Sequence, residues 1–304
     1  MKILVTGGAG YLGAVAVPRL LESGHEVTVL DNLMYAQQSL LHVCGAPGFA
    51  FVRGDVRDDG LVRRLVANAD AIVPLAAVVG APACARDPWL ARSVNVEAMR
   101  LLLRHRSPAQ LIVYPTTNSG YGSTSGEAIC TEETPLRPIS LYGETKAEAE
   151  RAVLDAGNAV TLRLATVFGV SPRMRTDLLV NHFVYAAVTD GYLVVFERQF
   201  KRNFVHIGDV ADCLAACVAR GPELAGRCYN FGLDSANLSK EELALRVRAH
   251  VPGFAVYFDE IGQDPDRRNY IVSSERLRGL GIAARRSLDD GIRELLQAYA
   301  MRQR

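Results

Sequence analysis

The sequence has almost no charge imbalance and no long apolar run. Its 34 lysines and arginines nearly balance 33 aspartates and glutamates, so the formal net charge is +1. A near-neutral chain lacks the excess of basic groups that attracts nucleic acid or anionic membranes. No apolar stretch is long enough to cross a bilayer. We therefore expect neither nucleic acid nor membrane among its partners.

Cysteine and histidine are few and scattered. The six cysteines form no C-x-x-C pair, and the six histidines follow no ligand spacing. Cys213 and Cys217 stand four residues apart in an apolar stretch, which favours buried thiols over a metal site or a disulfide. A strand predicted at residues 2–5 leaves no room for a signal peptide before it. These absences predict a cytoplasmic protein without a metal.

What the sequence does contain is a glycine turn between a strand and a helix. Residues 6–13 read TGGAGYLG, after the apolar run at 3–5. Gly7 can adopt backbone angles closed to other residues, Gly10 lets a pyrophosphate approach, and Gly13 lets the helix pack closely on the strand. A helix that starts here offers free N–H groups to phosphates. The turn predicts a bound dinucleotide, with a plain ligand-free turn as the alternative.

Asp31 adds weight to the dinucleotide. It follows the apolar run at 27–30, at the spacing of a carboxylate that accepts the adenosine ribose hydroxyls. An acid at this point also repels a 2′-phosphate, so NAD is favoured over NADP.

Apolar strands alternate with helical periods through the first half of the chain. With 304 residues, 49% of them hydrophobic, the chain can bury a large core as one domain or two coupled ones. Strands are predicted at 2–5, 27–30, 50–53, 71–75, 110–114 and 160–164, and helices at 10–23, 60–67, 88–104 and 141–154. Continuous apolar strands separated by helices indicate an α/β fold, with a doubly wound parallel sheet covered on both faces. Ligands then bind beyond the carboxyl ends of the strands.

After about residue 169 this alternation loosens. Helices are predicted at 177–189, 208–220, 239–250, 274–280 and 287–297, and strands at 193–196, 203–206, 228–231 and near 256. Ser239 suits the N-cap of its helix. We expect a dinucleotide-binding domain at 1–169. Residues 170–304 are expected to form a smaller, interleaved C-terminal lobe that mainly binds substrate, with some segments returning to the sheet.

A tyrosine and a lysine form the candidate catalytic pair. Tyr142 and Lys146 stand four residues apart and share one face of the predicted helix. A nearby ammonium stabilises phenolate and suits acid–base catalysis near neutral pH. Thr116 and Thr117 end a strand-like run and bring hydroxyls to the ligand edge of the sheet. Taken singly, these residues also suit a surface lysine, a packing tyrosine and a capping threonine.

With these motifs on hand, the chain resembles an extended short-chain dehydrogenase/reductase of the nucleotide-sugar epimerase and dehydratase group, such as the UDP-glucose 4-epimerase-like proteins. The resemblance covers nearly the whole chain. Besides the glycine turn it includes DNL at 31–33, GDV at 54–56, LAA at 75–77, Asn95, YG at 121–122, YGETK at 142–146 and RNFVHIGDV at 202–210. It implies a Rossmann-type fold, NAD as cofactor and a nucleotide-diphosphate sugar as substrate. By analogy it also implies a homodimer through helices 88–104 and 141–154.

The resemblance also implies roles for individual residues. The cofactor positions are Gly7, Gly10, Tyr11 and Leu12 at the pyrophosphate, Asp31 and Asn32 at the adenosine ribose, Asp55 and Val56 at the adenine, Leu75, Ala76 and Ala77 toward the nicotinamide, and Asn95. Thr117 would hydrogen-bond the sugar hydroxyl and Tyr142 would remove its proton. Lys146 would bind the nicotinamide ribose and polarise Tyr142.

Substrate positions follow from the same resemblance. They are Asn118 and Ser119 after the catalytic threonine, Thr166 near the sugar nucleotide, Asn181 at a phosphate, and Arg202 and Arg268 at the diphosphate. Arginine suits phosphate because its planar fork grips two oxygens, although a lone arginine is as often solvated surface. Arg173 and Arg175 are expected to order their loop, and His206 and Asp209 to place the helix that follows them.

The chain departs from the family pattern in three places. Dehydratases carry acids where Asn118 and Ser119 stand, and neither residue here is a plausible base for a carbon acid; Glu127 is the nearest acid in sequence. Thr166 replaces an asparagine and cannot copy both ends of an amide. Residues 78–80 lack a lysine of well-known galactose epimerases, which disfavours UDP-galactose as the substrate.

These observations favour an NAD-dependent nucleotide-sugar epimerase that acts at C4 through a transient 4-keto sugar. The main rival uses the same residues for net oxidation or reduction, as a 4-dehydrogenase or 4-ketoreductase. A 4,6-dehydratase is less favoured. A non-catalytic dinucleotide sensor or scaffold on the same fold is the third possibility, and the complete set of Thr117, Tyr142 and Lys146 argues against it.

Overall fold

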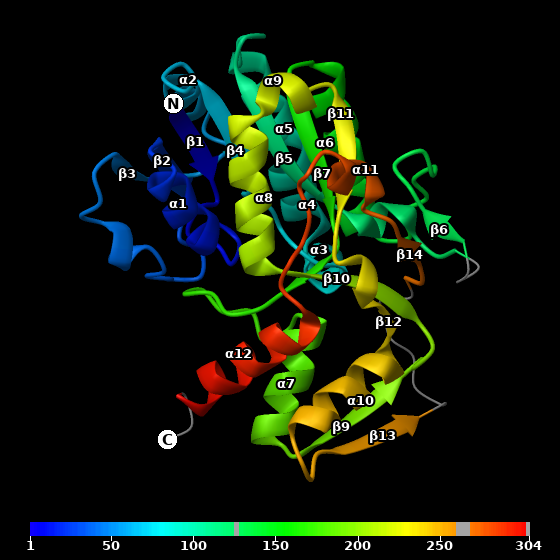
Figure 1. The fold of residues 1–304 in the computed structure, drawn as a ribbon. Coiled ribbons are helices and arrows are strands. Elements are labelled where there is room, and N and C mark those ends of the chain that lie inside the picture. The colour runs from blue at the N-terminus through cyan, green and yellow to red at the C-terminus, as the bar shows by residue number, and fades with distance from the viewer. Residues whose placement is uncertain (125–127, 260–267, 302–304) are drawn as a thin grey trace.

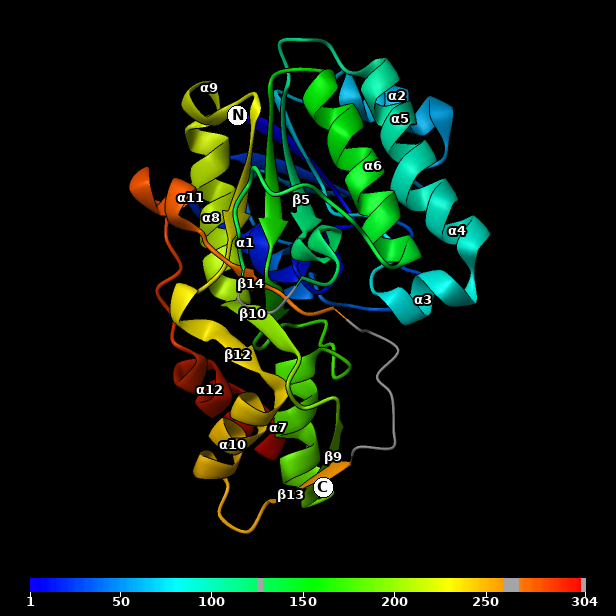
Figure 2. The same ribbon diagram turned by 90° about the vertical axis from the view of Figure 1, so that its right-hand side faces the viewer.

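A parallel sheet of seven strands is the main element of the computed structural model, which describes residues 1–124, 128–259 and 268–301. The strand order is β11-β7-β5-β4-β1-β2-β3, and every pairing is parallel (Figures 1 and 2). The strands are β1 (Lys2–Thr6), β2 (Glu26–Asp31), β3 (Phe49–Arg53), β4 (Ala71–Pro74), β5 (Leu111–Thr117), β7 (Ala159–Leu164) and β11 (Arg227–Phe231).

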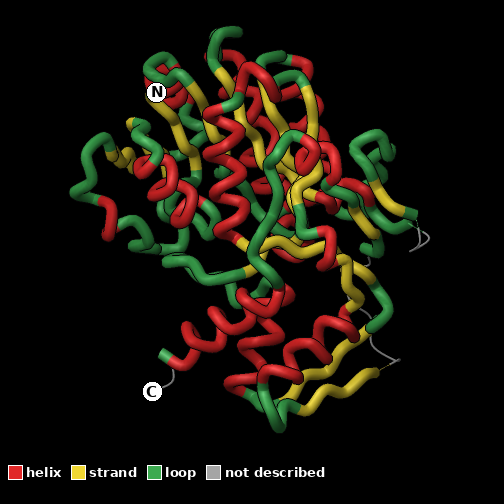
Figure 3. Tube along the Cα trace, viewed as in Figure 1, coloured by secondary structure: helices red, strands yellow, loops and turns green. Residues whose placement is uncertain are grey.

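Helices cover both faces of this sheet (Figure 3). Along β1, Ile3 and Val5 join one core cluster and Leu4 joins another, because successive strand side chains point to opposite faces. On the first face lie α1 (Gly13–Glu22), α8 (Ile207–Ala219), α9 (Gly221–Leu224) and α11 (Glu275–Gly279). On the second lie α2 (Asp59–Val66), α5 (Ala98–His105) and α6 (Leu141–Asp155). Full burial of each large aliphatic side chain contributes about 1.5–3 kcal/mol, so this two-sided burial holds the sheet together.

The predicted Rossmann-type fold is confirmed. The strand order reverses beside β1, which pairs with β2 on one side and β4 on the other. In such sheets ligands bind at this switch point, outside the carboxyl ends of the strands. Strand β11 comes from the second half of the chain and pairs with β7, so the two halves interleave. The boundary at residue 169 stays a prediction.

The C-terminal lobe lies on the side to which the strands of the main sheet point (Figures 1 and 2). Its own core joins α7 (Leu179–Thr189), α10 (Lys240–His250) and α12 (Leu288–Ala300) to the parallel pair β9 (Tyr192–Phe196) and β13 (Ala255–Asp259). Ser239 accepts the Glu242 N–H and caps α10 as predicted, and Ser287 caps α12 in the same way. Over the described ranges, no helix is long and apolar enough to cross a membrane.

Most of the short elements between the lobes were not predicted. They are β6 (Ile129–Cys130), β8 (Thr166–Phe168), β10 (Lys201–His206), β12 (Asn237–Ser239) and β14 (Ile271–Val272), of which only β10 was expected, and the helix α3 (Ala81–Arg86). Strands of two or three residues carry no periodicity that a sequence could reveal. The helix predicted at 88–104 consists of α4 (Pro88–Arg92), a π-helical turn at Ser93–Glu97 and α5. The helix predicted from residue 10 starts at Gly13, because residues 10–12 form the glycine turn.

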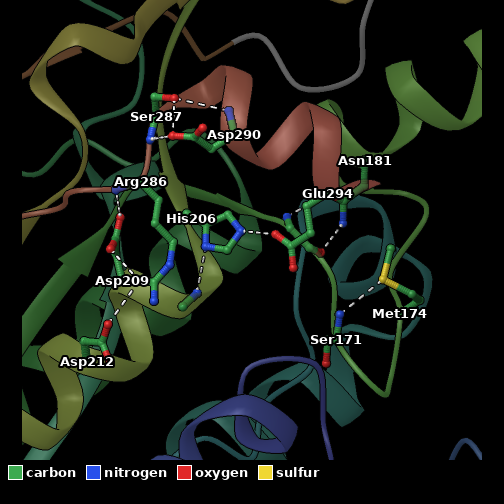
Figure 4. A network of polar contacts seen from close by, with 12 residues as sticks. Ser171, Met174, Asn181, His206, Asp209, Asp212, Arg286, Ser287, Asp290 and Glu294 are labelled. Carbon is green, nitrogen blue, oxygen red and sulfur yellow. Dashed lines mark hydrogen bonds and ion pairs between the residues drawn. The ribbon is translucent and has the colours of Figure 1, made fainter. Parts of the chain in front are cut away.

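A polar network fastens α12 to the sheet (Figure 4). His206, at the end of β10, accepts the Gly208 N–H at Nδ1 (3.1 Å), and its Nε2 lies 2.5 Å from Glu294 of α12. Asp209 is 3% exposed and accepts the N–H of Arg286 (2.9 Å) and its guanidinium (2.7 Å). The network supports the predicted structural role of His206 and Asp209, since it joins the start of α8 to the segment that leads into α12.

We expect Asp209→Asn to lower the free energy of unfolding by about 2 kcal/mol. The change leaves the Arg286 guanidinium and the backbone N–H groups of Arg285 and Arg286 poorly compensated. Asp212 pairs with the same Arg286 (3.0 Å) but is 43% exposed, so Asp212→Asn is the matched control, with a loss under about 1 kcal/mol. Urea denaturation of both variants measures the difference. Equal losses would contradict the role of the buried carboxylate.

Candidate active site

The glycine turn at the end of β1 approaches the neighbouring backbone too closely for any side chain. Gly7 has φ +70°, and a Cβ there would lie 2.5 Å from the Ala76 nitrogen. A Cβ on Gly13 would lie 2.4 Å from the carbonyl oxygen of Gly8. Within the turn, the Gly10 N–H donates to the Gly7 carbonyl (3.0 Å). Glycine is therefore required at both the first and the last position of the turn.

The turn presents free N–H groups at the start of α1. No side chain caps this helix. As far as the structure is described, the N–H groups of Tyr11 and Leu12 donate to no acceptor. Free donors at a helix N-terminus, with the positive end of its dipole, form a site for an anion such as a pyrophosphate.

Asp31 ends β2 beside this turn. It is 6% exposed, and it accepts the N–H groups of Ala9 (3.0 Å) and Leu33 (2.8 Å). The carboxylate thus orders both the glycine turn and the loop after β2. Contact with a ribose stays a prediction for it.

The other adenosine-side residues lie next to Asp31. Arg57 donates to both oxygens of Asp55, and its hydrogen bonds hold the pKa of Asp55 at about 2. The amide of Asn32 also reaches Asp55, at 3.5 Å. The structure therefore gathers Asp31, Asn32 and Asp55 at the carboxyl ends of β2 and β3, although Asp55 is already bound by a neighbour.

Asn95 ties the loop after β4 to α6. Its Oδ1 accepts the Val78 N–H (2.8 Å), and its Nδ2 donates to the Val78 carbonyl (3.0 Å) and to Thr145 of α6 (3.1 Å). This loop begins with residues 75–77, predicted to lead toward the nicotinamide. Val56, Ala76 and Asn95 line one cavity beside β4. The described contacts of Asn95 are structural, and its role toward a cofactor stays a prediction.

The three predicted catalytic residues meet where β5 ends. Thr117 is the last residue of β5, and Tyr142 and Lys146 lie in the first turns of α6, whose N-cap is Ser140. The ammonium of Lys146 donates to the Pro115 carbonyl (2.8 Å) and lies 4.1 Å from the centroid of the Tyr114 ring. These contacts fix α6 against β5, which brings the phenol of Tyr142 to the hydroxyl of Thr117.

Burial shifts both titratable groups of the pair. It raises the pKa of Tyr142, and the positive charges of Arg268 and Arg175 and a hydrogen bond with Thr117 oppose the rise. Burial lowers the pKa of Lys146 to about 7, against the attraction of Glu150. Lys146 therefore changes charge near neutral pH, where acid–base catalysis works best.

Two predicted phosphate ligands meet beside this pair. Ser119 shares a hydrogen bond with Thr117 (2.8 Å) and accepts one from Arg268. Arg268 lies 3.5 Å from the Tyr270 hydroxyl, and Arg202 lies 5.9 Å from the centroid of the same ring. Tyr270 thus joins two arginines that are 66 positions apart in the sequence. The sequence showed only an aromatic residue two places after Arg268, which by itself signals nothing.

Asn118 is buried without a partner. It is 1% exposed, and in the described part of the structure neither end of its amide makes a hydrogen bond. A buried polar group without a partner costs about 1–3 kcal/mol, and such a group beside Thr117 is available to a ligand. Thr166, half-buried at the start of β8, pairs with Phe204 of β10 in the three-stranded sheet formed by β12, β10 and β8.

Asn181 is built into the protein rather than directed at open space. It is fully buried, its Oδ1 accepts the Gly169 N–H (3.0 Å), and its Nδ2 donates to the Arg175 carbonyl (2.9 Å). The same Nδ2 donates to the Tyr11 hydroxyl (3.2 Å), which itself donates to the Gly169 carbonyl (2.7 Å). Because its amide is engaged at both ends, we assign Asn181 a supporting role and do not carry the predicted phosphate contact forward.

Arg175 is the residue that sequence reasoning undervalued. Its side chain is 16% exposed and pairs with Asp177. Its charge opposes the rise in the pKa of both Tyr142 and Tyr11, so its guanidinium lies near the predicted catalytic tyrosine and near the tyrosine of the glycine turn. In the sequence, Arg175 is a loop residue close to Asp177, and neither feature indicates that it lies near Tyr142. Glu127, the alternative acid, lies outside the described residues.

Comparison with known proteins points to enzymes of two kinds. A model of the NAD dependent epimerase/dehydratase family matches residues 3–232. The low-salt glycan biosynthesis protein Agl12 of Haloferax volcanii is 30% identical over 98% of each chain. A dTDP-glucose 4,6-dehydratase of Streptomyces griseus is 32% identical over 98% of this chain and 93% of its own. A solved Thermus thermophilus UDP-glucose 4-epimerase in complex with NAD is 26% identical over 99% of each chain, with a TM-score of 0.84.

We expect Lys146→Met to stabilise the protein most below pH 7. The unfolded lysine keeps its ordinary pKa of 10.5, whereas the folded one titrates at about 7. The wild type therefore pays for burying the charge at low pH and regains about 4 kcal/mol as pH rises from 7 toward 10.5. Urea denaturation at pH 6.5 and 9.5 measures this change. A difference between the two proteins that is independent of pH would refute the buried charge.

Proposed function

We propose that this chain, which belongs to the NAD dependent epimerase/dehydratase family, is an NAD-dependent nucleotide-sugar epimerase that acts at C4. One observation carries the proposal. Thr117, Tyr142 and Lys146 meet at the end of a central strand, on the edge of the sheet where the glycine turn lies. The two positions after Thr117 hold an amide and a hydroxyl instead of carboxylates.

The residues of the turn fit NAD. Free N–H groups at Tyr11 and Leu12 suit its pyrophosphate, and the carboxylate of Asp31 at the end of β2 suits an unphosphorylated ribose. Gly7 and Gly13 allow the tight backbone packing of the turn, in which a Cβ on either residue would clash with the backbone of Ala76 or Gly8. When bound, NAD would supply the hydride acceptor and, for the return step, the hydride donor.

The protein's own groups would manage the proton. The phenolic oxygen of Tyr142 takes the proton of the C4 hydroxyl as the sugar is oxidised and returns it as the sugar is reduced. Thr117 would donate a hydrogen bond that orients the C4 hydroxyl of the sugar. The ammonium of Lys146 would stabilise the phenolate form of Tyr142. Inversion follows when the 4-keto sugar turns and receives hydride on its other face.

The substrate class is a nucleoside diphosphate sugar. Arg202 and Arg268 converge on Tyr270 beside the catalytic threonine, and two guanidinium groups suit a diphosphate. The unpartnered amide of Asn118 would contact the sugar. A homodimer remains part of the proposal, although the outer faces of α4 to α6 carry ion pairs within the chain, such as Arg100–Glu148 (2.7 Å).

The second candidate is NAD-linked net oxidation or reduction at C4. The same catalytic residues would serve, and Thr166 in place of an asparagine favours a sugar unlike galactose. Removal of water is disfavoured because Asn118 and Ser119 cannot take a proton from carbon, even though a relative of 32% identity is a 4,6-dehydratase.

A panel of UDP-, GDP-, dTDP- and CDP-sugars, each with and without added NAD⁺, separates these reactions. We expect a sugar inverted at C4 with no net NADH, as measured by NMR of the product and absorbance at the NADH band. Stoichiometric NADH would indicate a dehydrogenase. Release of water would overturn the conclusion drawn from Asn118 and Ser119.

We expect Tyr142→Phe to lower kcat by about 10³-fold, because the general base is lost. NAD binding, followed by fluorescence titration, should change little. Tyr257→Phe, on an exposed tyrosine of β13, is the matched control and should keep full activity. A Tyr142→Phe variant with normal turnover would remove Tyr142 as the base.

A further inference from the structure

A buried ion pair lies directly behind the catalytic residues. Arg163 of β7 donates to Oε1 of Glu150 on α6 from Nε (2.9 Å) and Nη2 (2.7 Å). The two side chains are 8% and 4% exposed. Replacing such a pair by apolar residues is often neutral or stabilising, so stability alone does not account for it.

The second carboxylate oxygen is held by the strand that carries Thr117. Thr116 donates to Oε2 of Glu150 at 2.6 Å, and Thr116 immediately precedes the catalytic threonine. One carboxylate on α6 therefore binds both β5 and β7. A shift of α6 along the sheet, which would move Tyr142 away from Thr117, has to break these contacts.

Glu150 is also the counter-charge of Lys146. The two residues stand one helical turn apart and share a face of α6. The groups recorded around Lys146 are Glu150 from α6, the Tyr114 ring and the Pro115 carbonyl from β5, and Cys84 from α3. Burial raises the pKa of Cys84 to about 11 and keeps its thiol neutral. Glu150 is the carboxylate among these groups, and its negative charge favours the ammonium form of Lys146.

The same pair reaches the substrate side of the site. Nη1 of Arg163 donates to the Tyr121 hydroxyl (3.1 Å), which donates to Oδ1 of Asn230 (2.7 Å). Nδ2 of Asn230 in turn donates to the Ser273 carbonyl (3.1 Å). The hydrogen-bonded chain ends at Ser273, which follows Arg268 by five residues in the sequence.

We propose that Glu150 is a positioning residue for catalysis, whose carboxylate, clamped by Arg163 and Thr116, holds α6 in register with β5 and favours the charged form of Lys146. It acts through Lys146 and Thr117 and touches no substrate. The inference rests on the proposed function to the extent that the Tyr142 and Lys146 pair is catalytic.

Two substitutions separate the charge from the tether. Glu150→Gln removes the charge and keeps an oxygen for Thr116. The alkaline limb of the kcat profile should then move down by about one to two pH units, since Lys146 loses its charge earlier. Thr116→Val keeps the charge and removes the tether, and it should lower kcat about tenfold without moving that limb. Glu148→Gln makes the same change on the exposed face of α6 and should match the wild type.

Lys146 can also be titrated directly. NMR of ¹⁵N-lysine-labelled protein, with the Lys146 signal identified by its absence in Lys146→Met, gives the charge of the amine without any substrate. We expect its midpoint to fall by about one to two pH units in Glu150→Gln and to stay unchanged in Glu148→Gln. If Glu150→Gln does not fold, the neutral pair Glu150→Gln with Arg163→Gln avoids an unpaired buried cation and serves in both measurements.

The outcomes distinguish the two proposals. A Lys146 midpoint and an alkaline limb that are identical in wild type and Glu150→Gln would overturn the role of Glu150. A protein that inverts no nucleotide sugar, yet shows the shifted Lys146 midpoint, would overturn the proposed function and leave the charge role standing. Equal loss of activity in Glu148→Gln would also overturn the inference, because it would show that any charge change on α6 has the same effect.

Discussion

The site depends on an ammonium group held inside the protein. Lys146 is 5% exposed, and a buried charge survives only where neighbours replace its water. The Pro115 carbonyl, the Tyr114 ring and the carboxylate of Glu150 provide that replacement. Each comes from an element that also carries or adjoins a catalytic residue. The same contacts therefore stabilise the charge of Lys146 and align the phenol of Tyr142 with the end of β5.

At the predicted cofactor side, backbone groups rather than side chains shape the site. The glycine turn lies so close to the start of the loop after β4 that no side chain fits. Among the described residues, the N–H groups of Tyr11 and Leu12, just before α1, find no acceptor. The segment after β8 then crosses this turn. Ser171 donates to the Tyr11 carbonyl (2.7 Å), and Asn181 joins the Tyr11 hydroxyl to the same segment. The C-terminal lobe is thus anchored on the glycine turn, and Arg175 lies near both Tyr11 and Tyr142.

Relatives of similar identity are named for different reactions, so family membership alone does not decide the reaction. What separates these reactions chemically is whether a second base can take a proton from carbon. Asn118 and Ser119 cannot, and Ser119 is occupied by Thr117 and Arg268. Our proposal therefore assigns the choice of reaction to the two residues after the strand, and substrate affinity to arginines brought in from elsewhere.

The sequence by itself determined the parallel sheet, the glycine turn, Asp31 and the pairing of Tyr142 with Lys146. Each of these depends on residues within one strand or a few helical turns, where period and spacing are readable. Only the tertiary structure decided that Asn181 supports the loop, that Tyr270 joins Arg202 to Arg268, that Arg175 reaches the catalytic tyrosine, and that Arg163 completes Glu150. The carboxylate and guanidinium of that last pair come from different elements, and Tyr121 and Asn230 of the same network are 109 positions apart. Such contacts carry no local pattern, because they exist only after the sheet has brought distant segments side by side.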